Sequence, residues 1–271
     1  MVIFGDAKNL ELSSQSKSNM SNLKTALVTG CTSGIGKAAA IKLSQEGYRI
    51  ILNGRRQDRL ESLQRELNTE TLLMPIDVRN LKELEVFINS LPLAWKNIDV
   101  LVNNAGLAAG LSSFEHGDFE HWDRMVDTNL KGLLYVSRLV VPLMIDNGKG
   151  HIINISSIAG KEVYANGNVY CATKHAVDAL SRTMRIDLAK YPIKVSAINP
   201  GAVETEFSIV RFDGDAERAK KVYEGFENLV AEDIAEALWF IVSRPEHVTI
   251  NDLTIMPTAQ PTVGVIHRKN A

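Results

Sequence analysis

The sequence predicts an α/β protein built on one doubly wound, mostly parallel sheet of seven strands with helices on both faces. Two observations predict this fold. Short apolar runs alternate with amphipathic helical segments from residue 25 onward, which is typical of parallel strands joined by helical crossovers. The strand-like runs are also apolar almost throughout, as strands are when both faces of their sheet are covered. Right-handed crossovers then place helices on each side of a single sheet.

Seven runs rich in valine, isoleucine and leucine predict the strands. The first four are "TALVTG", "YRIILNG", "TLLMPIDV" and "IDVLVNNAG", at 25–30, 48–54, 71–78 and 98–106. The last three are "GHIINISSIAG", "IKVSAINPGAV" and "DLTIMPTA", at 150–160, 193–203 and 252–259. Their length and their bounding glycine, proline and polar residues favour strands over helices.

Helical periodicity fills the intervals between these runs. Segments such as "QDRLESLQRELN" are charged and amphipathic, and the predicted helices lie at 34–46, 57–68, 81–92, 119–145 and 168–190. Gly47 is placed to end the first helix in a left-handed conformation. Pro142 is expected to bend or end the fourth helix, because proline removes a helical hydrogen bond.

The chain shows no internal repeat, low-complexity tract or linker rich in proline and glycine. We therefore expect one domain over 23–271, preceded by a flexible tail at 1–22. The tail is polar and rich in serine, and it lacks the basic and apolar regions of a signal peptide. Met20 is an alternative start, because it leads directly into the first strand.

Composition excludes several classes of function. Thirty basic side chains stand against thirty-two acidic ones, without a long block of either sign, which argues against nucleic acid or an anionic membrane as a partner. Cys31 and Cys171 lie far apart without metal-ligand spacing, so we expect no disulfide, no metal and a reducing cytoplasm. The longest apolar stretch, 132–145, is too short to span a bilayer and contains Arg138. We expect a soluble protein.

The first strand runs into "TGCTSGIG", which spaces Gly30, Gly34 and Gly36 between a strand and a helix. At such a turn the backbone can approach a phosphate closely, and the N-terminus of the helix faces it. Glycines also occur in turns for structural reasons alone, so the prediction depends on the position of this triplet between a strand and a helix. It indicates a nucleotide-binding site.

The end of the second strand indicates which nucleotide. An NAD site usually has an acidic residue there, bonded to the ribose 2′-hydroxyl, but Gly54 and Arg55 occupy this place. Arg55, together with Arg56, offers planar guanidinium donors suited to a 2′-phosphate, which favours NADP. The alternative is two solvated arginines at the start of a helix. Asp77 and Val78, after the third strand, fit the adenine edge, although an aspartate after a strand is also a common N-cap.

Further motifs resemble the short-chain dehydrogenase/reductase family in order and spacing over about 22–260. They are "TGCTSGIG", "DV" at 77, "NNAG" at 103, Asn129 in "DTNLKG", Ser157, the pair Tyr170 and Lys174 four positions apart, and "PG" at 200. The resemblance implies a single Rossmann-like domain that transfers a hydride between NAD(P) and an alcohol or carbonyl. It also implies a homodimer or homotetramer, with dimer contacts through the 119–145 and 168–190 helices.

The segments 97–110, 201–223 and 258–268 are similar to one branch of this family. That branch contains NADP-dependent 3-hydroxy acid dehydrogenases, which act on serine, allo-threonine and related acids such as 3-hydroxypropionate. The resemblance places the cofactor on residues of the turns that follow the strands and on the tyrosine–lysine pair. These residues are Gly30, Thr32, Ser33, Gly34, Ile35, Gly36, Arg55, Arg56, Asp77, Val78, Asn104, Ala105, Gly106, Tyr170, Lys174, Pro200, Gly201, Val203 and Thr205.

The resemblance also assigns catalysis to four residues. A free tyrosine has a pKa of about 10 and is a poor base at neutral pH. Lys174 projects from the same helix face as Tyr170, so its ammonium would favour the phenolate; lowering the pKa to about 7 corresponds to about 4 kcal/mol. By resemblance, Lys174 also bonds the nicotinamide ribose, and Ser157 bonds the substrate oxygen. By resemblance, Asn129 would hold a water that links Lys174 to solvent.

A lid over the substrate is expected at about 204–225, after the sixth strand, with Val203 and Thr205 contacting the carboxamide. An acidic substrate needs a cation, and Arg211 in the lid is our candidate. Lys161 and Arg268 are rivals, and a solvated lid arginine is the alternative.

Three functions fit these observations. The first is an NADP-dependent dehydrogenase of short β-hydroxy acids. The second is an NADPH-dependent reductase of another small carbonyl, such as sulfoacetaldehyde. The third, from a different class, is a non-catalytic NADP-sensing protein, since fold alone does not determine function. The complete set of four catalytic residues argues against the third.

Overall fold

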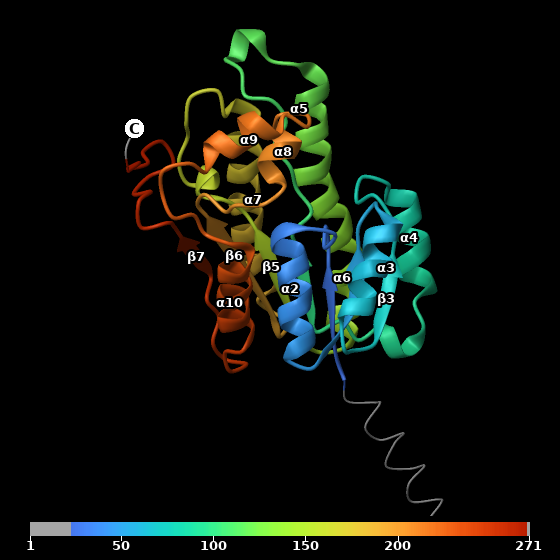
Figure 1. Cartoon of the computed structure of the whole chain (residues 1–271). Helices are drawn as coiled ribbons and strands as arrows, with labels where there is room; N and C mark the ends of the chain where they lie inside the picture. The colour runs from blue at the N-terminus through green and yellow to red at the C-terminus, as the bar shows by residue number, and fades with distance from the viewer. Residues whose placement is uncertain (1–22, 270–271) are drawn as a thin grey trace, which may run out of the picture.

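The seven strands lie in one continuous sheet in the order β3-β2-β1-β4-β5-β6-β7, and every neighbouring pair is parallel. The computed structural model describes residues 23–269 (Figure 1). The strands are β1 (Lys24–Val28), β2 (Tyr48–Asn53), β3 (Thr71–Met74), β4 (Val100–Asn103), β5 (Gly150–Ile155), β6 (Ile193–Pro200) and β7 (Asp252–Ile255). The predicted fold is confirmed, with a sheet that is parallel throughout. The flexible tail expected at 1–22 lies outside the described residues.

The strand order reverses between β1 and β4. From β1 the chain proceeds through β2 to β3 at one edge, and it then returns to the middle of the sheet and proceeds from β4 to β7 at the other edge. At such a reversal the connections after adjacent strands lead to opposite faces, which leaves a crevice outside the carboxyl ends of the strands. The turns after β1 and β4 flank this crevice.

Helices cover both faces of the sheet (Figure 1). One face is covered by α2 (Gly34–Gln45), α3 (Gln57–Glu66) and α10 (Ala231–Val242), and the other by α4 (Leu81–Ser90), α6 (Leu133–Asp146) and α7 (Asn168–Leu188). Within β1, Ala26 and Val28 pack under the first set of helices and Leu27 under the second. All three are fully buried, which explains why the strand is apolar over residues 26–28.

Three shorter helices lie beyond the carboxyl ends of the strands. They are α5 (Phe119–Val126), α8 (Phe207–Arg211) and α9 (Ala216–Val222), at the top of the view in Figure 1. Both α8 and α9 belong to the segment expected to form the lid. They follow β6 directly, so the last residues of that strand lead into the lid.

The predicted helix at 119–145 is interrupted where the sequence does not indicate a break. A π-helical segment, Asp127–Gly132, separates α5 from α6, whereas α6 continues through Pro142 to Asp146. Pro142 and Arg138, whose carbonyl loses its helical partner, are both exposed, so water can satisfy the carbonyl. Pro142 therefore does not end the helix, and that part of the expectation is wrong. The π-helical segment instead buries Asn129.

The structure also bears on the end of the first helix, the cysteines, membrane-spanning helices and metal-binding clusters. The first helix ends as expected, with Gly47 at φ +85° after α2. Cys31 and Cys171 are free and buried. Across residues 23–269, none of the helices combines the length and apolarity that crossing a membrane requires. The same residues contain no cluster of three or more side chains suited to holding a metal ion.

Candidate active site

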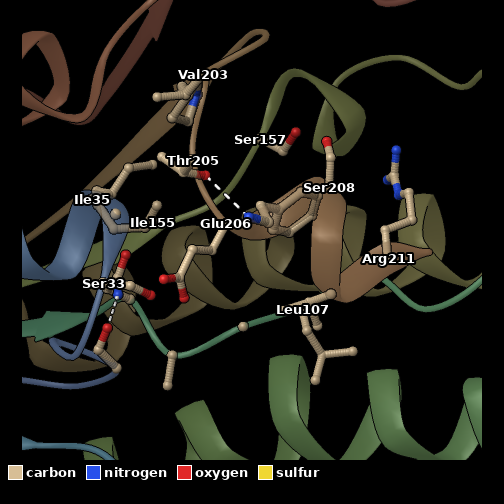
Figure 2. Close-up of a pocket in the computed structure, with 18 of the residues that line it drawn as sticks. Ser33, Ile35, Leu107, Ile155, Ser157, Val203, Thr205, Glu206, Ser208 and Arg211 are labelled. Carbon is tan, nitrogen blue, oxygen red and sulfur yellow. Dashed lines mark hydrogen bonds between the residues drawn. The ribbon is translucent and has the colours of Figure 1, made fainter. Parts of the chain in front are cut away.

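A cavity of about 450 Å³ lies outside the carboxyl ends of the strands, at the reversal between β1 and β4 (Figure 2). Every residue that the sequence assigns to the cofactor, to catalysis or to the substrate lines it, except Gly36 and Asn129. Figure 2 shows Ser33 and Ile35 of the first turn at one end of the cavity and Arg211 of the lid at the other. The fold therefore brings together residues that lie far apart in the sequence.

The turns after β1 and β4 are bonded to each other at the base of the cavity. Asn104 Nδ2 donates to the carbonyl oxygens of Thr29 and Gly30, at 2.9 and 3.1 Å. Thr29 Oγ1 accepts from the backbone N–H groups of Asn104 and Ala105, each at 3.0 Å. Gly36 lies behind this contact, where a Cβ would come within 2.4 Å of the Gly30 oxygen. Gly36 therefore lets α2 pack against the turn instead of lining the cavity.

Two arginines and two hydroxyl groups gather at the end of β2. Arg56 donates to Thr32 Oγ1 at 2.9 Å and to Ser33 Oγ at 3.5 Å, while the Arg55 side chain is 63% exposed. A Cβ at Gly54 would lie 2.5 Å from the methyl group of Thr32, so this position has no room for the acidic side chain of an NAD site. The donors present suit a 2′-phosphate, and Arg56 lies closer to the first turn than the sequence suggests.

Asp77 lines the cavity and does not cap a helix. The N-cap of α4 is Asn80, whose Oδ1 accepts from the backbone N–H of Glu83 at 3.3 Å. Asp77 instead accepts from the side chain of Arg79 at 2.7 Å. Burial acts to raise the pKa of the Asp77 carboxyl, but the hydrogen bonds and charge of Arg79 outweigh it, so the pKa is lowered. The alternative interpretation of Asp77 as an N-cap is wrong.

Tyr170 and Lys174 occupy the first two turns of α7 and are both buried. Lys174 Nζ donates to the carbonyl oxygen of Ile155, at the end of β5, at 3.0 Å. The same nitrogen lies 5.9 Å from the centre of the Tyr170 ring. Because α7 packs against the end of β5, both side chains point to the same edge of the sheet.

The pKa values of this pair differ from the sequence-based expectation. Burial raises the pKa of Tyr170 to about 12, and it lowers the pKa of Lys174 to about 8. The cation that lowers the pKa of Tyr170 is Arg211, whose guanidinium carbon lies 5.2 Å from the ring centre. The expected lowering of the Tyr170 pKa by Lys174 is therefore not observed, because burial disfavours the charged form of both groups.

The side chain of Asn129 is engaged with the protein. Its Nδ2 donates to the Leu107 carbonyl at 2.8 Å and to Thr173 Oγ1 at 3.1 Å, and its Oδ1 accepts from the Leu107 N–H at 2.8 Å. These bonds fix the chain after β4 against α7. They use both N–H donors of the amide, so the water expected at Asn129 cannot be bound by that NH₂ group.

Ser157 follows β5 and faces the cavity. Its Oγ accepts from the backbone N–H of Ala159 at 3.1 Å. A hydrogen bond between Ser157 and Tyr170 also acts to lower the pKa of Tyr170, although burial and the charge of Arg211 have larger effects. Because the Ser157 hydroxyl can rotate, it can donate instead to an oxygen bound beside Tyr170.

Arg211, at the end of α8, is a lid residue beside Tyr170. It donates to Tyr164 Oη at 2.7 Å and lies over the rings of Tyr170 and Phe207. Its Nε is buried and has no partner among the described residues. A cation placed between the catalytic tyrosine and the lid is suited to an anionic ligand.

The two rival cations are engaged elsewhere. Lys161 Nζ lies 2.5 Å from Asp178 and 2.7 Å from Asp252, and it does not line the cavity. Arg268 donates to the carbonyl oxygens of Val222 and Glu224. Of the three candidates, only Arg211 faces the cavity.

Tyr164 and Glu206 are the two polar cavity residues with side-chain partners that matter most among those not identified from the sequence. Tyr164 lies in the connection between Ser157 and Tyr170, and that position was the only signal for it. Glu206, beside the predicted contact Thr205, points into the cavity (Figure 2). Its partners belong to a different part of the chain, so local sequence could not reveal its role.

Comparisons with known proteins agree with this site. The chain matches the family model described as short chain dehydrogenase over residues 24–215. The NADP-dependent 3-hydroxy acid dehydrogenase YdfG of Salmonella typhi is 47% identical over 244 residues, which are 89% of this chain and 98% of that protein. The NADP-dependent 3-hydroxy acid dehydrogenase of Schizosaccharomyces pombe is 39% identical over 253 residues, which are 92% and 98% of the two chains.

Two solved structures of serine dehydrogenases are also similar to this chain in fold and sequence. The closed form of serine dehydrogenase complexed with NADP⁺ has a TM-score of 0.87 and 45% identity, and the match covers 90% of this chain and 100% of that one. Serine dehydrogenase from Escherichia coli has a TM-score of 0.76 and 41% identity, over 87% and 99% of the two chains. From its glycine turn, its tyrosine–lysine pair and these similarities, we conclude that the chain belongs to the short-chain dehydrogenase family.

Proposed function

We propose that the protein is an NADP-dependent dehydrogenase that transfers a hydride between NADP(H) and the hydroxyl-bearing carbon of a short 3-hydroxy acid. Serine, allo-threonine and 3-hydroxypropionate are the substrate type. One observation carries the proposal: a single cavity has a pair of arginines at one end and Arg211 at the other, with Tyr170 beside Arg211 and Lys174 next to Tyr170. Similar proteins named as NADP-dependent 3-hydroxy acid dehydrogenases support it.

We assign the arginine end of the cavity to the cofactor. Arg56, Thr32 and Ser33 would hold the 2′-phosphate, with Arg55 at the solvent side. The N-terminus of α2 would face the pyrophosphate. NADP, when bound, supplies the nicotinamide carbon that accepts a hydride in oxidation and gives it back in reduction.

We assign proton transfer to the buried residues Tyr170 and Lys174. In oxidation the hydride leaves the carbinol carbon, and the hydroxyl proton passes to Tyr170; in reduction Tyr170 returns this proton to the carbonyl oxygen. Ser157 donates a hydrogen bond to the same oxygen. Lys174 exchanges protons with Tyr170, and Asn129 acts as a positioning residue through Leu107 and Thr173. The high pKa of Tyr170 suits a proton donor.

We assign the acid group of the substrate to Arg211. Its guanidinium lies beside Tyr170, so a carboxylate bound there would put the 3-hydroxyl within reach of the tyrosine. Tyr164 orients this guanidinium through its hydrogen bond. A sulfonate would suit the same donors, which keeps a sulfoacetaldehyde reductase as the second candidate.

We further propose that residues 23–271 form one domain, that the protein is cytoplasmic and that it is a homodimer or homotetramer. The free, buried cysteines support a reducing compartment. Phe114 and Phe119 are 70% and 76% exposed and pack on Trp122, which supports a contact with a second copy. Light scattering coupled to gel filtration would give the oligomeric state.

Replacing Tyr170 by phenylalanine tests catalysis directly. The variant keeps the ring and its packing but loses the hydroxyl that we assign to proton transfer, so we expect turnover to fall by about 10³-fold or more. The dissociation constant of NADPH, measured by its fluorescence, should change less than about threefold. Turnover that survives at more than a tenth of the wild-type rate would rule out Tyr170 as the proton carrier. Wild-type protein that binds NADPH without turning over any acid or carbonyl would favour the non-catalytic sensor.

Replacing Arg211 by alanine tests the anchor. We expect the KM for 3-hydroxypropionate to rise tenfold or more, which corresponds to about 1.4 kcal/mol of lost binding. The KM for NADP⁺ should stay within about twofold, because Arg211 lies at the other end of the cavity.

The matched control is Arg218→Ala. Arg218 is an exposed lid arginine that packs on Phe212 and does not line the cavity, so its loss should leave both KM values unchanged. A rise of less than tenfold in Arg211→Ala, or an equal rise in Arg218→Ala, would assign the acid group to another residue.

The opposite pKa shifts of Tyr170 and Lys174 predict how the rates of oxidation and reduction depend on pH. The pair loses its first proton at the Lys174 pKa of about 8, and Tyr170 follows at about 12. Oxidation needs a group that can take a proton, so its rate should rise with pH between about 7 and 9, while reduction falls. The substrate 3-hydroxypropionate is suitable because its carboxyl group does not titrate in this range. Oxidation rates that fall across this range would contradict the assignment.

A further inference from the structure

We propose that Glu206 is a clasp that holds the lid closed across the cofactor end of the cavity, and that its ion pairs with Arg59 and Arg56 set the rate at which NADP(H) leaves. Glu206 would then be a positioning residue, because it acts through the lid and through Arg56. This inference rests on the proposed function in one respect, since it takes the arginine end of the cavity as the cofactor site.

The ion pairs join two parts of the molecule that face each other across the cavity. Glu206 immediately precedes α8, and both arginines lie at the start of α3. Arg59 Nη1 lies 2.8 Å from one carboxylate oxygen of Glu206 and 2.9 Å from the other, and Arg56 Nη1 lies 3.5 Å from the carboxylate. Glu206 lines the cavity and points toward the Ser33 end of it (Figure 2). A ligand at this end would therefore lie under the ion pairs.

Arg56 connects the clasp to the phosphate-binding turn. Its Nη2 donates to Thr32 Oγ1 at 2.9 Å while its Nη1 faces Glu206. Burial acts to raise the pKa of Glu206, but Arg59, Arg56 and a hydrogen bond from Ser33 outweigh it, so the pKa is lowered and the carboxylate is charged at neutral pH. The same guanidinium that we assign to the 2′-phosphate is thus oriented by the lid.

The opposite end of α8 is attached independently. Asp213, which has a φ of +51°, lies 3.3 Å from Arg124 and 3.4 Å from His121 of α5. The backbone N–H of Gly110 donates to the Arg211 carbonyl at 2.9 Å. Because these contacts hold the substrate end of the lid, loss of the Glu206 pairs would release the cofactor end alone.

Exposure makes this clasp suited to repeated opening. The side chains of Glu206 and Arg59 are 43% and 40% exposed, so water can replace either partner at small cost. A single nitrogen shared by both carboxylate oxygens still gives a charge-assisted contact stronger than a neutral hydrogen bond. Since cofactor must leave in every catalytic cycle, a contact of this strength can slow release without preventing it.

The test is the rate constant for NADPH dissociation, measured by stopped-flow displacement and nicotinamide fluorescence on the full-length protein. We expect Glu206→Gln to raise this rate constant about fivefold, as loss of a partly exposed ion pair would. Arg59→Gln should raise it to a similar or smaller extent, because Arg56 still faces the carboxylate. The dissociation rate constant of the double variant should be no higher than that of Glu206→Gln, since both changes remove the same interaction.

Glu204→Gln is the matched control. Glu204 lies two residues earlier in the same segment, but its carboxylate faces Asn228 at 3.4 Å and not an arginine. Its loss should leave the dissociation rate constant unchanged. Raising the salt concentration should speed NADPH dissociation from both the wild-type protein and Glu206→Gln, because salt screens the 2′-phosphate contact. It should speed dissociation more from the wild-type protein, which also has the exposed Glu206 ion pairs.

A Glu206→Gln rate constant within about twofold of wild type, or additive effects of Glu206→Gln and Arg59→Gln, would overturn the inference. An equal acceleration in Glu204→Gln would overturn it as well, since general loosening of the lid would then explain the effect. A wild-type protein that binds no NADPH would instead refute the proposed function. The two failures are therefore distinguishable.

Discussion

The burial of a tyrosine and a lysine in the same wall of one cavity is the constraint on which the rest of the site depends. Low polarity disfavours the charged form of each group, so the pKa of Tyr170 rises to about 12 while that of Lys174 falls to about 8. The two values move in opposite directions, which leaves the pair able to give up one proton near neutral pH. The Ile155 carbonyl and the packing of α7 on β5 keep this pair at the carboxyl edge of the sheet.

The lid contributes charged side chains to this site as well as apolar contacts. Arg211 is the nearest cation to Tyr170, and it acts against the effect of burial on the tyrosine. Acidic residues on either side of α8 attach the lid to α3 and to α5, across opposite ends of the cavity. These pairs are exposed enough to open. The same short helix can therefore contribute to substrate recognition and, through Glu206, to cofactor release.

Much of the fold and part of the site could be predicted from the sequence, because both depend on local patterns. Apolar runs give the strands, and the glycine spacing gives the turn at β1. The π-helical segment at Asn129 was not predicted because it contains no proline, whereas α6 continues through Pro142. The contact of Glu206 with Arg59 joins positions 147 residues apart, and no local pattern encodes such a pair. The raised pKa of Tyr170 depends on burial, which four-residue spacing does not reveal.

The central claim is that the two arginine-bearing ends of the cavity select NADP and an acidic substrate at the same time. The most direct measurement is the initial rate of cofactor reduction, by nicotinamide absorbance, with L-serine, allo-threonine and 3-hydroxypropionate, each with NADP⁺ and with NAD⁺. We expect turnover of these acids with NADP⁺ and at least about tenfold less with NAD⁺. Equal rates with the two cofactors, or silence on every acid while NADPH still binds, would contradict it.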